Sequence, residues 1–312
     1  MEISYAQLEY PLACAQLVFV MLGMGATLRV TDFLEVVREP RPLLVGLFCV
    51  VLISPLIGWL MTWLLPLPVE IAVGLILIAL MPGGAFSNLC TFLGRGNLAL
   101  SIAMTAIGTL ASLFTVPFLL PWLAYGYVPA DFQMPVELIL QEVFIYMGLS
   151  LVAGMLIGHF LPRFRVYFAK WCVRVGILIL LVVVVGSLVS GRIQPGAYGL
   201  GPPLAIIFFC LFIGQLTMLP FRILKWPTPD RLAVGVEVTI RNVNLAVMLN
   251  ALIFPATQPD DLGAGTLYVV LFYGAVSLFV APPLVLVHRH LILRHHPLPK
   301  QTPTNVEVGV MR

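Results

Sequence analysis

Charged residues are scarce in this chain. Only 10% of the 312 residues are Asp, Glu, Lys or Arg, whereas 60% are hydrophobic and the mean hydropathy is +1.03. A soluble domain of this length could not bury so much apolar surface. The shortage of charge therefore excludes an ordinary soluble protein and indicates an integral membrane protein.

Several features of secreted and catalytic proteins are also missing. The five cysteines are odd in number and contain no CxxC pair, so neither a disulfide framework nor a zinc site is indicated. No Lys or Arg precedes Arg29, so the N-terminus lacks the basic region of a cleavable signal peptide. The hydrolase motifs HExxH and GxSxG do not occur, and His159 is the only mid-chain histidine, so we do not expect an enzyme.

Apolar runs of about the ~20 residues that a helix needs to cross a bilayer recur along the chain. They are continuously apolar rather than alternating, which favours helices over barrel strands. The predicted spans are 11–28, 42–65, 71–93, 98–123, 136–161, 166–190, 202–223, 232–254 and 266–287. We therefore predict an all-α membrane protein with nine transmembrane helices in a single domain, residues 1–290, followed by a cytoplasmic tail, 291–312.

Basic residues alternate between the predicted loops. Of the 17 Lys and Arg residues, 15 fall in or close beside every second loop or in the tail, one (Arg192) falls in the intervening loops, and Arg241 lies in the middle of a span. By the positive-inside rule, the N-terminus is outside and the C-terminus is cytoplasmic, most simply in a plasma (inner) membrane. The net charge of +3 thus reflects topology and does not indicate nucleic acid binding. No obligate protein partner is evident, and the lipid bilayer is the expected surrounding.

The third predicted span contains the sequence MPGGAFSN. Pro82 removes a helical hydrogen bond, and Gly83 and Gly84 weaken the turn beside it, so the helix is expected to break near the middle of the membrane. Broken backbone is tolerated there only if protein or a wet cavity surrounds it. A simple proline kink is the alternative, but Ser87 and Asn88 supply polar groups where the backbone opens.

Two further spans carry polar residues. The eighth contains EVTIRNVNLA, in which Glu237 and Arg241 each cost roughly 2.5 to 3.5 kcal/mol at the membrane centre unless they meet a partner or a cavity. It has no proline, so a break is less evident there. The fourth places Ser101, Thr105 and Thr109 on one helix face, although such hydroxyls often only bond the carbonyl one turn back.

Interrupted helices at corresponding positions of two halves are typical of secondary transporters with inverted repeats, whose site lies at the midplane. Unwound carbonyls and hydroxyls suit a hard cation such as sodium, and half-helix N-termini favour an anionic substrate. We therefore expect two discontinuous crossing helices at such a site.

The quoted segments resemble a known family. The stretch MPGGAFSNLCTFLGRGNLALSIAMTAIGTL resembles the signature of the bile acid:sodium symporter family, and EVTIRNVNLA is similar to its E-x-x-x-Q-N motif. The resemblance implies a core domain, here about 42–123 and 202–287, and a panel domain, about 11–28 and 136–190. It also implies transport of a small organic anion by alternating access with Na⁺ as the coupling ion.

The resemblance also implies binding residues. One sodium site of the family is matched by Ser87, Asn88, Ser101, Thr105 and Glu237. The second would use Glu237, backbone oxygens near Val238 and Ile240, and two Gln side chains, whose places are taken here by Arg241 and Val50. Substrate contacts are expected from Asn242 and from the backbone amides of Ala85 and Phe86.

Arg241 is the departure from the family pattern, and three roles stay open. Its permanent charge could replace the second sodium ion, because at i+4 in a helix it would share a face with Glu237; one sodium ion per substrate would then suffice. It could instead pair with a substrate carboxylate or sulfate. Alternatively, Glu237 could carry protons without sodium.

The substrate and the exact class of carrier also stay open. Bile acids, steroids and smaller organic or keto acids are all compatible with the motifs. The broken helices are also compatible with a sodium-independent carrier of the same fold, a carrier of the arsenite or auxin type, or a non-transporting membrane sensor.

Overall fold

The computed structural model describes residues 4–29, 40–128, 133–257 and 261–295. These residues form helices joined by short connections, and they contain no strand, only one isolated β-bridge between Gly83 and Arg241. The helices are α1 (Tyr5–Thr27), α3 (Pro40–Phe48), η1 (Cys49–Ile53), α4 (Ser54–Leu64), α5 (Val69–Leu80), α6 (Ala85–Leu93), α7 (Leu98–Ala124), α8 (Val136–Glu142), η2 (Val143–Leu149), α9 (Ser150–Phe160), α10 (Arg165–Val189), η3 (Pro195–Tyr198), α11 (Gly201–Thr217), α12 (Leu219–Ile223), α13 (Thr228–Thr239), α14 (Val243–Ile253) and α15 (Asp261–His295).

Seven of the predicted spans are continuous apolar stretches of helix in the described residues, each long enough to cross a membrane. The other two are each divided into short helices, α5 with α6 and α13 with α14. The chain is therefore an integral, multi-pass helical membrane protein. The last helix, α15, continues to His295, five residues past the predicted end of the transmembrane domain at 290.

The second continuous span contains a local widening. Its central turn, η1, is π-helical, and the Ser54 N–H bonds the Cys49 carbonyl five residues back. Pro55 follows directly and has no N–H of its own. Because proline cannot make the usual bond to the residue four positions earlier, the widened turn accommodates it without breaking the span.

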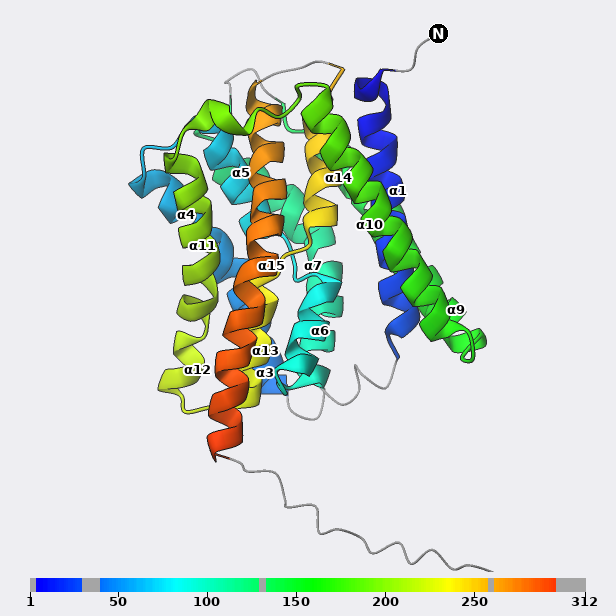
Figure 1. The fold of residues 1–312 in the computed structure, drawn as a ribbon, viewed down its shortest axis with the longest axis vertical. Helices are drawn as coiled ribbons and strands as arrows, with labels where there is room; N and C mark the ends of the chain where they lie inside the picture. The colour runs from blue at the N-terminus through cyan, green and yellow to red at the C-terminus, as the bar shows by residue number, and fades with distance from the viewer. Residues whose placement is uncertain (1–3, 30–39, 129–132, 258–260, 296–312) are drawn as a thin grey trace, which may run out of the picture.

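Glycines bring α1 against α9. A Cβ built on Gly154 would overlap the Leu22 carbonyl and would lie 3.0 Å from both the Ala26 nitrogen and the Gly25 Cα. Gly158 faces the Ala26 carbonyl in the same way. Small residues that let backbones touch are the usual means of helix association in lipid. With α10 also packed on α1, these three helices form one tight group (Figure 1).

Several of the other helices pack around α5. Every residue of α5 from Ile71 to Leu80 is buried, as expected for a helix that is hydrophobic all round. It packs against α4, α7 and α15, and α11 and α13 pack on α15 in turn. In Figure 1, α5 and α14 lie in the upper half of the molecule and α6 and α13 in the lower half, so the two divided spans run in opposite directions.

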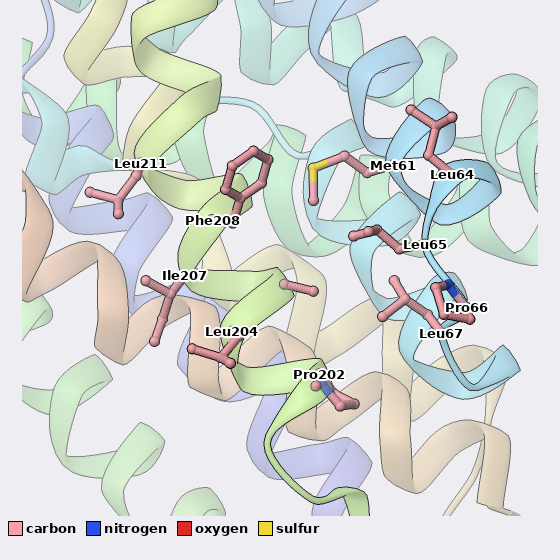
Figure 2. Close-up of a pocket in the computed structure, with 12 residues that line it drawn as sticks. Met61, Leu64, Leu65, Pro66, Leu67, Pro202, Leu204, Ile207, Phe208 and Leu211 are labelled. Carbon is pink, nitrogen blue, oxygen red and sulfur yellow. The ribbon is translucent and has the colours of Figure 1, made fainter.

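The outer surface suits lipid. Large apolar side chains are exposed along α10, and Trp59, Trp63, Trp122 and Tyr125 gather around one hollow formed by α4 and the end of α7. Aromatic side chains of this kind are enriched where a membrane meets water. A second hollow of about 650 Å³ lies between α4 and α11 and is lined by apolar residues such as Met61, Leu204 and Phe208 (Figure 2). It offers an anion no polar side chain.

Replacing Gly154 by Ala is expected to destabilise the protein by about 1–3 kcal/mol, because the new methyl group overlaps the α1 backbone. Gly148→Ala in the same span is the matched control, since its Cβ would meet side chains only at 3.7–3.9 Å, an ordinary contact. Thermal unfolding of the two purified variants measures the difference. Equal melting temperatures would contradict the glycine packing described here.

Candidate functional site

The two divided spans cross where each is interrupted. Between α5 and α6 the chain is non-helical over residues 81–84, and between α13 and α14 over 240–242. The Gly84 N–H donates to the Ile240 carbonyl at 2.9 Å, and the Asn242 N–H donates to the Pro82 carbonyl at 2.8 Å. These two bonds make the antiparallel bridge between Gly83 and Arg241. Each interruption thus satisfies backbone groups of the other, which is required of non-helical chain inside a membrane.

Local chemistry explains the first interruption and partly the second. Pro82 lies two residues after Leu80, the last residue of α5, and lacks an N–H, as the sequence indicates. Gly83 is needed for a separate reason, because a Cβ there would overlap the carboxyl group of Glu237. In the second interruption Asn242 caps α14, and its Oδ1 accepts the Leu245 N–H at 3.1 Å. An Asn N-cap was the available sequence signal for this start.

The five residues predicted for one sodium site lie together beside the crossing. Ser87 and Asn88 come from α6, Ser101 and Thr105 from α7, and Glu237 from α13. The Ser87 hydroxyl donates to Glu237 Oε2 at 2.5 Å. Asn88 Oδ1 accepts from Ser101 Oγ at 2.9 Å and lies 3.3 Å from Thr105 Oγ1. Asn88 is partly exposed and the other four side chains are fully buried.

This cluster contains more acceptor oxygens than hydroxyl protons. The single proton of Ser87 faces both the Glu237 carboxylate and the Gly84 carbonyl, 2.7 Å away. The single proton of Thr105 faces the Ser101 carbonyl at 2.9 Å as well as an amide oxygen. Glu237 Oε1 is buried and has no hydrogen-bond partner in the described part of the chain. A cation would supply the positive charge that such a group of oxygens lacks.

The charge of the cluster indicates which kind of cation fits. Glu237 is its only carboxylate and lies in the last turn of α13, where the helix dipole makes a negative charge unfavourable. No group of three or more His, Cys, Asp or Glu in the described residues could hold a metal ion. One negative charge among neutral hydroxyl, amide and carbonyl oxygens suits a hard monovalent cation rather than a transition metal.

Arg241 lies at the end of α5. Its guanidinium donates to the Met81 carbonyl at 2.8 Å and to the Ser54 hydroxyl. The Ser54 hydroxyl in turn donates to the Ala79 carbonyl at 3.2 Å. The side chain is only 3% exposed. A fixed positive charge therefore stabilises the free carbonyls at the negative end of this half-helix.

The helical pairing of Glu237 with Arg241 expected from their i, i+4 spacing is wrong. The helix α13 ends at Thr239, so helical spacing no longer places the two side chains on one face. Within the described residues they form no ion pair, since Glu237 bonds Ser87 while Arg241 bonds Met81 and Ser54. They still lie close enough for their charges to interact.

The other expected positions of the second sodium site lie around the same place. Val50 is buried in η1, one turn before Ser54. Val238 is buried at the end of α13, and the Ile240 carbonyl is already occupied by the Gly84 N–H. The family's second sodium site would use two Gln side chains here. In this chain an apolar side chain, Val50, and the guanidinium of Arg241 take their places.

The residues predicted to contact substrate lie at two half-helix N-termini. Ala85 and Phe86 begin α6, and Asn242 precedes α14. Phe86 is 36% exposed, whereas Asn242 is 1% exposed and its Nδ2 has no hydrogen-bond partner in the described part. The bridge between the interruptions brings the positive ends of both helices to the crossing.

Three residues of the site were missed from the sequence. Thr91 Oγ1 lies 3.1 Å from Ser101 Oγ and is one turn after Ser87, a spacing that could have indicated it. Ser54 is a hydroxyl residue within an apolar span, which is only a weak sequence signal. The Tyr273 hydroxyl donates to the Thr239 carbonyl at 2.7 Å and so fixes the end of α13. No sequence signal pointed to that contact between distant segments.

The sequence pattern of the Sodium Bile acid symporter family matches residues 14–194. A protein of Bacillus subtilis (strain 168) described as "Uncharacterized sodium-dependent transporter YocS" is 34% identical over 235 residues, which are 74% of this chain and 70% of that protein. A protein of Oryza sativa subsp. japonica, "Probable sodium/metabolite cotransporter BASS1, chloroplastic", is 45% identical over 113 residues, 36% of this chain and 28% of that protein. The mouse "P3 protein" is 28% identical over 246 residues, 76% of this chain and 50% of that protein.

The fold and the buried oxygen cluster define an integral membrane protein built around two crossing, interrupted helices. The chain belongs to the sodium bile acid symporter family. The resemblance drawn from its two motifs is therefore confirmed.

Gly83→Ala is expected to destabilise the protein by about 1–3 kcal/mol or more, because the new methyl group displaces the Glu237 carboxyl group from the cluster. Gly108→Ala is the control in the buried helix α7, where a Cβ would meet only Pro82 at 3.6 Å and Leu47 at 4.0 Å. Thermal unfolding of both variants tests this. Equal melting temperatures would show that a glycine at position 83 is not needed to make room for the Glu237 carboxyl group.

Proposed function

We propose that this protein is a sodium-coupled symporter that carries small organic anions across a membrane by alternating access. The observation that supports it best is the buried oxygen cluster of Ser87, Asn88, Ser101, Thr105 and Glu237, contributed by three helices. Na⁺ bound there would neutralise Glu237 and complete the coordination of its free oxygen. The sodium-dependent transport named for the relative from Bacillus subtilis is consistent with this function.

The cluster would couple the ion to the substrate through the crossing. Ser87 and Asn88 lie in the first turn of α6, the helix whose N-terminal residues, Ala85 and Phe86, would face the substrate. Asn242 would contribute its free amide group from the other interruption. An ion that draws Glu237 of α13 toward α6 and α7 orders both half-helix N-termini, and an anionic substrate then meets two positive helix ends.

Nine membrane crossings are part of the proposal. The two divided spans, run in opposite directions and joined by an antiparallel bridge, support inverted repeats with a core and a panel domain. The lower end in Figure 1 carries α12 with Arg222 and the ends of α6 and α9, which Arg95 and Arg163 follow. That end would be cytoplasmic in a plasma (inner) membrane, with the N-terminus outside.

One sodium ion per substrate is the coupling ratio that we propose. Arg241 brings a permanent positive charge to the end of α5, and the second site has no side-chain amide to offer an ion. Since the guanidinium stays with the protein, it does not cross with the substrate. Cotransport of one Na⁺ with a monovalent anion is then electroneutral.

Thr105→Ala is expected to raise the sodium concentration needed for half-maximal uptake roughly ten-fold, because the loss of one buried oxygen ligand costs about 1–3 kcal/mol of binding free energy. Ser112→Ala is the matched control in the same helix, since its buried hydroxyl bonds the Thr109 carbonyl at 2.7 Å and lies outside the cluster. Uptake of organic anions into proteoliposomes, measured against sodium concentration and against a proton gradient, gives the readout. Uptake that depends on protons alone, or no uptake at all, would contradict sodium coupling.

The Hill coefficient of sodium-dependent uptake is expected to be close to one in the unaltered protein. In Arg241→Gln, which restores an amide at this position, we expect steeper sodium dependence, because a mobile cation can take the vacated place. Lower substrate affinity with unchanged sodium dependence would instead assign Arg241 to the substrate. Arg163→Gln, at an exposed arginine, controls for the change of charge.

A further inference from the structure

Polar side chains join α1 to α14 at two depths. Gln16 of α1 donates its Nε2 proton to Asn244 Oδ1, close to the start of α14. Arg192, which follows α10, forms an ion pair with Glu9 of α1 at 3.5 Å and donates to the Phe254 carbonyl at the end of α14, 2.7 Å away. Glu9 and Gln16 are seven residues apart and so share one face of α1. We call these five residues the α1–α14 seam; the helices can be followed in Figure 1.

The α1–α14 seam is buried but incompletely hydrogen-bonded. Glu9 is 1% exposed, Gln16 is 0% and Arg192 is 8%. Of the twelve buried side-chain polar atoms without a hydrogen bond in the described residues, five belong to these three side chains, and two of the five are the Glu9 and Arg192 atoms of the ion pair. Such atoms are unfavourable in a permanently closed interface. They are readily explained if water reaches them in another state of the protein.

The other contacts of α1 are of a different kind. Gly25, Gly154 and Gly158 bring the backbones of α1 and α9 into direct contact, and the Cβ of a residue at position 176 in α10 would overlap Val20 of α1. Separating α1 from α9 or α10 would therefore lose close packing that water cannot replace. The α1–α14 seam differs in carrying polar side chains at both of its ends, and water can replace their contacts when the two helices separate.

We propose that the α1–α14 seam is the outer gate of the transport path and that Arg192 is its latch. This inference rests on the proposed transport function and orientation. With the gate closed, Arg192 holds α1 and the end of α14 together, and Gln16 covers the start of α14 through Asn244. When the seam parts, outside water reaches the crossing, where Asn242 has a free amide group.

The test is the accessibility of a cysteine placed within the seam. Ala13 is fully buried and lies one turn after Glu9 on the same face of α1. Ala13→Cys, in right-side-out vesicles, reports opening through its rate of labelling by a membrane-impermeant maleimide added outside. The native cysteines are all buried, and the protein without the substitution provides the background rate.

Adding Arg192→Gln is expected to raise the labelling rate several-fold, because the closed gate loses both of its outer contacts. Arg163→Gln, the same substitution at an exposed site, is expected to leave the rate unchanged. If Arg192→Gln alone does not fold, the double variant Glu9→Gln with Arg192→Gln leaves no unpaired charge and is expected to give the same increase. Equal labelling rates of Ala13→Cys in the presence and in the absence of Arg192→Gln would overturn the proposal.

The labelling does not require transport, so the two proposals can fail separately. A labelling rate that responds to Arg192 in a protein without sodium-dependent uptake would support an opening seam and refute the symporter function. Sodium-dependent uptake with a labelling rate that ignores Arg192 would refute the gate and leave the function standing.

Discussion

Two backbone hydrogen bonds hold the centre of this protein together. Inside a membrane, a carbonyl or N–H group that leaves its helix must find another partner, because no lipid group can replace it. Here the Gly84 N–H and the Asn242 N–H each find a carbonyl in the opposite interruption. Neither helix could be broken alone at this depth without leaving unpaired groups. The cluster around Glu237, the position of Arg241 and the meeting of two helix N-termini all depend on this exchange.

The same constraint separates what could be predicted from what could not. Pro82 and its two glycines mark the first interruption because their effects on a helix are local. The second lacks such residues, and it exists because the first provides partners for it. The pairing of Glu237 with Arg241 was wrong for the same reason, since helical spacing was assumed where the helix had already ended. The five side chains could be grouped from the sequence only through the family motifs, and the geometry of their cluster needed the fold.

Contacts between distant segments account for the other features of the structure that the sequence did not predict. The Tyr273 hydroxyl bonds the Thr239 carbonyl, and Arg192 joins α1 to the end of α14. No motif or spacing in the sequence links the partners of these contacts. The acidic and basic side chains inside apolar spans could be noted from the sequence, but their partners could not. Glycine is informative in a similar, limited way: its positions are plain in the sequence, whereas the structure identifies the backbone atoms that each glycine approaches.

Arg241 also changes how the crossing responds to its surroundings. A mobile ion stabilises the state that binds it in proportion to the logarithm of its concentration, once that concentration exceeds the dissociation constant. A guanidinium bonded to Met81 and Ser54 has no such dependence, because its local concentration is set by the chain. The guanidinium charge at the crossing is therefore independent of the salt content of the medium, and the end of α5 keeps its stabilising cation even where sodium is scarce.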